Sequence, residues 1–140
     1  MNYFQVNVNY DRQTGEDNPG RVKEAYLVPA ITCGEAENAV LERIKPMLFG
    51  DCETPKIQKK SYFDFFRCFP DGDIYYEAKV EMITIDGEKE CRKAVNILML
   101  ANNIKDALIT LLSYLVSYDC EVIGIKKTGI TDILSVEKCE

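Results

Sequence analysis

The sequence repeats one pattern of apolar and polar residues, with the two copies separated by about half the chain. The matching segments keep their order along the chain, and the offset between them changes only where loops are expected. Searching for repeats first is useful because a repeated unit restricts the folds that a chain can adopt. We therefore predict one domain made of two pseudo-repeats, covering residues 3–68 and 74–136. The matching segments are 3–8 with 75–80 at an offset of 72, 26–30 with 97–101 at 71, and 57–66 with 125–134 at 68.

Each copy is predicted to contain two strands, a helix and a third strand. Apolar and polar residues alternate along 3–10 and 75–82, which is typical of a strand with one buried face. Asp86-Gly87 is a strong hairpin signal after the second of these strands. Thr32 and Glu35 form a capping box at the start of one helix, and Asn103 is the expected cap of the other. The last strands are expected at 56–63 and 122–127.

Two copies of ββαβ contain the order βαββαβ, which is that of a ferredoxin-like split unit. We therefore expect the α+β class, with a mostly antiparallel sheet and both helices on one face, or two small sheets related by pseudo-symmetry. The helix-covered face would carry Phe4, Val6, Val8, Tyr76, Ala78 and Val80. The opposite face would carry Tyr3, Gln5, Asn7, Asn9, Tyr75, Glu77, Lys79 and Glu81.

Composition excludes several classes of function. The formal net charge of −6 disfavours duplex DNA binding, although cations gathered on one face are still compatible with binding to phosphates. The absence of histidine excludes His-based metal sites and Ser-His-Asp triads. No Walker motif, nucleophile elbow or calcium loop is complete. We expect no enzymatic activity, catalytic residue, cofactor or metal site.

Features that determine location point to the cytoplasm. No apolar run is long enough to cross a membrane, and the first residues lack the pattern of a signal peptide. No two of the six cysteines have the spacing of a zinc knuckle, and we expect ordinary thiols. They are Cys33, Cys52, Cys68, Cys91, Cys120 and Cys139.

Asp64 and Asp132 occupy equivalent positions in the two copies. They could be a pair of carboxylates at a pseudo-twofold axis, and a hydrolase using them would need a metal ion. The simpler interpretation, which we favour, is that each carboxylate caps a turn near the end of its copy. The segment 69–73 is expected to be the turn that joins the copies.

A basic and aromatic stretch at 56–67 is partly repeated at Lys126 and Lys127. Interleaved cations and rings on strands are typical of proteins that hold single-stranded nucleic acid. The alternative, which we favour for the rings, is that they belong to the core while the lysines protect a sheet edge. The candidate ligand contacts are Tyr3, Asn7, Lys59, Lys60, Tyr75, Lys79 and Lys127.

The segments 3–10, 25–30, 35–37, 75–80 and 130–134 together resemble an uncharacterised family of gut Bacteroidales and their phages, from Met1 to about Val136. The resemblance implies a small cytoplasmic protein of phage or prophage origin and transfers no catalytic residue. Our leading hypothesis is a non-enzymatic binding protein for single-stranded nucleic acid or a nucleotide. The alternative is a protein-interaction module, such as a phage inhibitor of a host defence or replication protein. A homo-oligomer is compatible with either hypothesis.

Overall fold

The computed structural model describes residues 2–12, 20–68 and 72–134, and within them the chain forms nine strands in two sheets and two helices. The sheets lie in separate compact units. The first unit joins Asn2–Lys60 to the segment from Gly129 onward, and the second unit is Ser61–Thr128. The predicted α+β class is confirmed. Residues 69–71 of the predicted joining turn lie outside the described residues.

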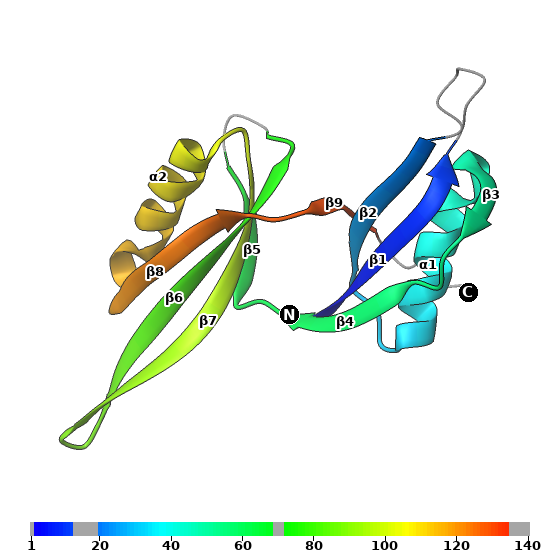
Figure 1. Ribbon diagram of the computed structural model, residues 1–140. Helices are drawn as coiled ribbons and strands as arrows, with labels where there is room; N and C mark the ends of the chain where they lie inside the picture. The colour runs from blue at the N-terminus through cyan, green and yellow to red at the C-terminus, as the bar shows by residue number, and fades with distance from the viewer. Residues whose placement is uncertain (1, 13–19, 69–71, 135–140) are drawn as a thin grey trace, which may run out of the picture. The chain divides into compact units, whose positions relative to one another are not determined.

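The first unit contains a five-stranded sheet and one helix (Figure 1). β1 pairs antiparallel with β2 and β3, β4 also pairs with β1, and β9 pairs parallel with β2. A short 3₁₀ turn, η1 (Lys45–Met47), follows the helix and contains Pro46. The main elements are β1 (Asn2–Arg12), β2 (Gly20–Val28), α1 (Cys33–Ile44), β3 (Leu48–Cys52), β4 (Lys56–Ser61) and β9 (Ile130–Ile133).

The second unit contains a four-stranded sheet in the order β5-β7-β6-β8 and one helix. β6 pairs antiparallel with β7 and β8, while β5 pairs parallel with β7. The predicted hairpin turn is confirmed: Asp86 pairs with Lys89, and Gly87 supplies the positive φ of 66° that the turn requires. The elements are β5 (Asp64–Arg67), β6 (Ile74–Asp86), β7 (Lys89–Ala101), α2 (Ile104–Tyr114), η2 (Leu115–Ser117) and β8 (Cys120–Lys127).

The two helices begin at the predicted caps. The Glu35 N–H donates to Thr32 Oγ1 at 3.2 Å, and the Glu35 carboxylate accepts from the Ile31 N–H at 3.2 Å. The Asp106 N–H donates to Asn103 Oδ1 at 2.9 Å. These bonds satisfy backbone donors that have no partner within the first helical turn.

Each helix packs on its own sheet, so the predicted single sheet with both helices on one face is wrong, whereas the alternative of two small sheets agrees with the structure; their relation by pseudo-symmetry and the ferredoxin-like repeat stay predictions. Both helices nevertheless use the same spacing of buried residues. The buried strand residues lie on the predicted helix-covered faces, with Phe4, Val6 and Val8 in the first unit and Tyr76, Ala78 and Val80 in the second. Full burial of one such large apolar side chain contributes about 1.5–3 kcal/mol. The buried helical residues are Ala36, Val40 and Ile44 before Lys45, and Ala107, Leu111 and Leu115 after Ile104.

Each predicted copy ends with one further short strand, and this strand pairs with a strand of the other copy. β5 follows β4 in the chain but pairs with β7, and β9 follows β8 but pairs with β2. The registers are equivalent, because Asp64 aligns with Ile97, Asp132 aligns with Tyr26, and these positions are related by the sequence offsets. The compact units therefore do not coincide with 3–68 and 74–136, and the duplication itself stays a prediction. Sequence analysis assigned no strand to either segment.

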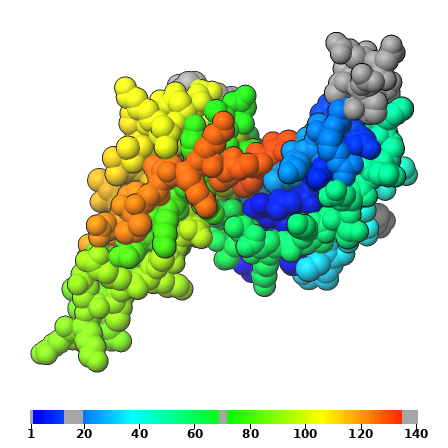
Figure 2. All heavy atoms as spheres, in the orientation of Figure 1, coloured from blue at the N-terminus to red at the C-terminus, as the bar shows by residue number. Residues whose placement is uncertain are grey.

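The side of α2 turned away from its sheet lies on the surface (Figure 2, yellow) and carries large apolar side chains, including Leu108 and Leu112. At the equivalent positions, α1 has Glu37 and a half-buried Leu41. The two helices therefore share their inner faces and differ in their outer ones.

Substitution of Gly72 by Ala should destabilise the second unit. An added Cβ would lie 2.0 Å from the carbonyl carbon of Ala101 and 2.4 Å from the backbone N of Asn102, so the backbone must move. We expect a loss of about 1–3 kcal/mol in the free energy of unfolding, measured by chemical denaturation. Gly124→Ala is the control, because no heavy atom lies within 4 Å of its added Cβ. Equal stability of the two variants would contradict the close approach.

Alkaline pH should destabilise the first unit through two tyrosines. The Tyr10 hydroxyl donates to Glu24, and burial, followed by this bond, raises the pKa of Tyr10 well above its usual value. Burial, followed by the charge of Glu24, raises the pKa of Tyr26 to about 12. Because the unfolded chain releases these protons near pH 10, the stabilisation is complete below about pH 10 and is lost as pH rises towards 12.

Circular dichroism with tyrosinate absorbance would follow this transition. In Tyr10→Phe, stability at neutral pH should fall by about 1 kcal/mol, since one buried hydrogen bond is lost. Its decline between pH 10 and 12 should be shallower than that of the unsubstituted chain. Parallel declines would show that Tyr10 does not contribute to the alkaline transition.

Candidate functional site

A hollow of about 490 Å³ lies in the first unit, and its lining includes Asn7, Asn9, Lys23, Glu53 and Lys56. Side chains alternate along a strand, so Asn7 and Asn9 point away from the helix-covered face that carries Val6 and Val8. The hollow thus uses the polar side of the β1–β2–β4 sheet. Its volume falls within the range of roughly 300–1,000 Å³ that is usual for small-molecule sites.

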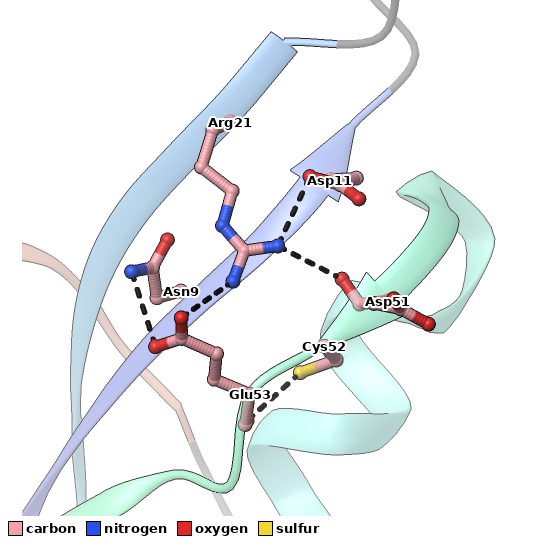
Figure 3. Close-up of polar contacts among 6 residues, drawn as sticks. All are labelled: Asn9, Asp11, Arg21, Asp51, Cys52 and Glu53. Atoms are coloured by element: carbon pink, nitrogen blue, oxygen red, sulfur yellow. Dashed lines mark hydrogen bonds and ion pairs between the residues drawn. The ribbon is translucent and has the colours of Figure 1, made fainter.

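Arg21 contacts Glu53, which lines this hollow, and two further residues (Figure 3). Its Nη1 atom donates to Asp11 Oδ1 at 3.0 Å and to the Asp51 carbonyl at 3.3 Å, while Nη2 lies 2.8 Å from Glu53 Oε1. The hydrogen bond to Asp11, with a further one to Glu53, raises the pKa of Arg21. The network therefore holds the Glu53 carboxylate in place, with one guanidinium shared between Asp11 and Glu53.

Asn9 presents an unpaired acceptor beside Glu53. Its Nδ2 donates to Glu53 Oε2 at 3.3 Å, and the backbone carbonyl of Asn9 accepts from the Glu53 N–H at 3.0 Å. An ionised carboxylate only accepts hydrogen bonds, so this contact fixes which end of the amide faces Glu53. Asn9 Oδ1 is then buried without a hydrogen-bond partner among the described residues. Such an atom costs about 1–3 kcal/mol unless a ligand donor satisfies it.

Two lysines supply positive charge to the hollow. Lys23 lies on β2 and Lys56 begins β4; both are exposed, and neither forms a salt bridge with a described residue. Glu24 also lines the hollow. It pairs with Val8 across the strands and therefore lies on the helix-covered side of the sheet, where its carboxylate accepts from the Tyr10 hydroxyl. The lining therefore contains two lysines that form no salt bridge with a described residue, two glutamates, and Asn9, whose Oδ1 has no donor among the described residues.

The second unit has a smaller hollow, of about 250 Å³, at equivalent sheet positions. Lys79 stands where the first unit has Asn7, and Gly124 where it has Lys56. Lys126 also lines it, but its ammonium group lies 3.3 Å from Glu77. This hollow therefore has less space and a cation that is already paired.

The arginine network is also present in both units. Arg92 lies 2.9 Å from Glu121 and 3.3 Å from Glu81 in the second unit, and Arg21 lies 2.8 Å from Glu53 in the first. The sequence offsets relate Arg21 to Arg92 and Glu53 to Glu121. Asn9, however, corresponds to Glu81, so the unpaired amide oxygen belongs to the first unit. Sequence analysis missed this cluster, although comparing charged residues at the repeat offsets could have found it.

The structure distributes the predicted contact residues over both units. Asn7 lines the first hollow and Lys79 the second, while Lys59 and Lys60 lie on β4 and Lys127 lies on β8, outside both linings. Their roles in binding stay predictions.

The two predicted tyrosines are buried. Tyr3 is 7% exposed and Tyr75 is 5% exposed, although both were expected on the open face. Because stacking on a base needs an accessible ring face, these tyrosines offer little surface to a nucleic acid in this conformation. The structure therefore supports a ligand contact by these tyrosines less well than one by the exposed lysines.

The other rings of the basic and aromatic stretch pack within the second unit. Phe65 stacks with Tyr75 at 6.4 Å between ring centroids, and Phe66 packs against Tyr114 at 5.0 Å. Phe63 meets Tyr118 edge to face at 5.9 Å. These contacts agree with the interpretation of the rings as packing residues.

Asp64 and Asp132 make equivalent local contacts in different units. Each carboxylate accepts from the backbone N–H of the next residue at 2.8 Å. Asp64 also accepts from the Tyr114 hydroxyl at 2.7 Å, and Asp132 lies 3.9 Å from Arg43. Arg43 and Tyr114 are themselves equivalent positions near the helix ends. Asp64 therefore connects β5 to α2, and Asp132 connects β9 to α1.

Other sequence features add little chemistry. Cys33, Cys52, Cys68, Cys91 and Cys120 are free thiols, while Cys139 lies outside the described residues. Burial raises the pKa of the Cys120 thiol. No three His, Cys, Asp or Glu side chains within 2–12, 20–68 and 72–134 are grouped to hold a metal ion. In the same ranges, no helix is long and apolar enough to span a membrane.

Comparison with known proteins yields one family match. Residues 2–136 match a family described as Domain of unknown function (DUF4494). No curated protein and no solved structure matches the chain. An origin in phages or gut Bacteroidales stays a prediction.

Asn9→Leu should show whether the fold needs the Asn9 side chain. The substitution removes the unpaired buried oxygen and one exposed contact with Glu53, so we expect unchanged or slightly higher thermal stability. Thermal unfolding measures this, with Asn7→Leu as the control because Asn7 is exposed on the same strand. A destabilisation well above about 1 kcal/mol would show that Asn9 is needed for the fold and is not reserved for a ligand.

Proposed function

The chain belongs to the DUF4494 family, and we propose that it is a non-enzymatic binding protein for a phosphate-bearing nucleotide, free or within single-stranded nucleic acid. The proposed site is the hollow of the first unit. The observation that carries the proposal is that Asn9, whose buried Oδ1 has no partner among the described residues, lines a hollow together with Lys23 and Lys56.

The chemistry of a nucleotide matches these groups. Lysine ammonium groups bind phosphate as point charges and would stabilise the anionic end of the ligand. An amino group of a base, or a ribose hydroxyl, would donate to Asn9 Oδ1. Glu53 would position Asn9 and take no direct part, because its two carboxylate oxygens already contact Arg21 and Asn9.

The charge distribution favours a short ligand over a duplex. The chain has a net charge of −6, and two acidic clusters surround Arg21 and Arg92. A duplex presents a long row of phosphates, which these acidic groups would repel. A single nucleotide requires only the two ammonium groups of Lys23 and Lys56.

Two matched double variants test this site. Lys23→Gln with Lys56→Gln removes two positive charges from the hollow, whereas Lys59→Gln with Lys127→Gln removes two charges outside it. Isothermal titration with ATP and fluorescence anisotropy with a labelled oligothymidylate report the two ligand forms separately. We expect the first pair to weaken binding at least about tenfold, since each lost phosphate contact contributes roughly 1 kcal/mol or more.

The salt dependence provides a second measure. For the oligonucleotide, the first pair should reduce the slope of log K against log salt by about 1.4, because each phosphate contact in a single strand contributes about 0.7. Equal losses in both double variants would mean that binding follows net charge, which would contradict the proposed hollow. Binding of ATP but not of the oligonucleotide would identify a free nucleotide as the ligand. Absence of binding to both would refute the proposal.

Protein interaction is a second candidate function, and one observation favours it. Five large apolar side chains on or next to α2 are between 40% and 85% exposed. Such a patch on a small protein commonly marks an interaction site. This surface belongs to the second unit, whereas the proposed nucleotide site belongs to the first.

A further inference from the structure

The outer side of α2 carries five exposed apolar side chains, which we call the α2 face. Residues three or four apart lie on the same side of a helix: 104, 108, 112 and 116 follow the spacing of four, and 109 lies three residues before 112. The residues of the α2 face are Ile104, Leu108, Ile109, Leu112 and Val116, the last of which lies in η2.

Packing within the second unit does not require this surface. α2 contacts its sheet through Ala107, Leu111 and Leu115, which correspond to the buried residues of α1. At positions equivalent to Ile109 and Val116, α1 carries the polar residues Asn38 and Lys45. A helix of this type can therefore pack on its sheet with a polar outer side.

The α2 face has few of the charges that a solvated helix normally carries: Lys105, four residues before Ile109, is the one charged residue of α2 on this side. No residue between Asp106 and Asp119 is charged. A helix that packs on one side is expected to be polar on the other, whereas a helix that is apolar all round is usually covered. The α2 face is therefore suited to burial against another helix.

We propose that a second copy of this chain covers the α2 face, with the two helices antiparallel about a twofold axis. In a twofold interface the same surface meets itself, so each position must suit the position that it faces. With the axis near Thr110, Ile104 faces Val116 of the partner copy and Leu108 faces Leu112. All four positions are apolar, so the pattern along α2 is self-complementary.

The charges at the two ends favour the same arrangement. Lys105 is exposed at the start of α2, and Asp119 is exposed just after η2. An antiparallel pair brings Lys105 of one copy towards Asp119 and the negative helix end of the other. A parallel pair would instead place the two Lys105 ammonium groups together. Asp106 is turned towards the cap, where its carboxylate accepts from Asn103 Nδ2.

The interface offered by one helix pair is small compared with the area of about 1,000 Å² that a stable complex usually buries. The dimer should therefore dissociate on dilution. Sedimentation equilibrium of the full chain over a series of concentrations is the direct measurement. We expect a reversible monomer–dimer equilibrium, and a monomer at every concentration would overturn the proposal.

Two double variants locate the interface. Leu108→Glu with Leu112→Glu should abolish the dimer, because it places four carboxylates in the apolar contact. Ile31→Glu with Ile85→Glu makes the same chemical change at isoleucines that are 85% and 75% exposed elsewhere. This control should dimerise like the unsubstituted chain. A dimer that survives the first pair of substitutions, or that is lost equally in the control, would overturn the proposal.

A charge exchange tests the antiparallel arrangement without altering the apolar residues. Lys105→Glu should weaken dimerisation several-fold, and adding Asp119→Lys should restore it, because the two positions then attract again with reversed signs. Both side chains are exposed, so folding should be preserved in either variant. Failure of the second substitution to rescue the first would exclude the antiparallel pair. If the α2 face binds only a different protein, the unsubstituted chain and all these variants will sediment as monomers, which would overturn the proposal.

Discussion

Parallel pairing of two short strands completes both sheets. β5 bonds to the edge of β7 and β9 bonds to the edge of β2, with the Cys68 N–H donating to Leu100 and the Leu134 N–H donating to Leu27. Without them, β2 and β7 would each present a row of unpaired backbone groups, which promotes aggregation. Asp64 and Asp132 fasten these strands to Tyr114 and Arg43 of the helices. Each unit is therefore complete only with a strand from a distant part of the chain.

The two sides of each sheet are constrained differently. The helix-covered side needs apolar residues, so its composition is constrained by packing. The other side can vary without loss of the core, and there the units differ: Asn9 and Lys56 in the first correspond to Glu81 and Gly124 in the second. The hollow and its unpaired acceptor arise on this variable side. The outer surfaces of α1 and α2 differ for the same reason.

Local features were predictable because they depend on neighbouring residues. Alternation identified the buried faces of β1 and β6, and short-range capping identified Thr32 and Asn103 as helix starts. The site was predictable only in part. Asn7 lines the hollow as a polar residue of the open face, but Asn9 acquires its unpaired oxygen only when Glu53, 44 residues later, takes its Nδ2. Nor could alternation show that Tyr3 is buried. The period of a strand shows on which side a residue lies but does not show whether other parts of the chain cover that side.

By itself, the sequence determined the class of the fold, the starts of both helices and the faces of β1 and β6 that the helices cover. Only the tertiary structure decided that there are two sheets and that β5 and β9 each join the sheet of the other half. The physical reason is that a short strand such as Asp64–Arg67 has the same local pattern whichever edge it joins. The partner is chosen by the path of the chain and by long-range hydrogen bonds, which no local spacing encodes.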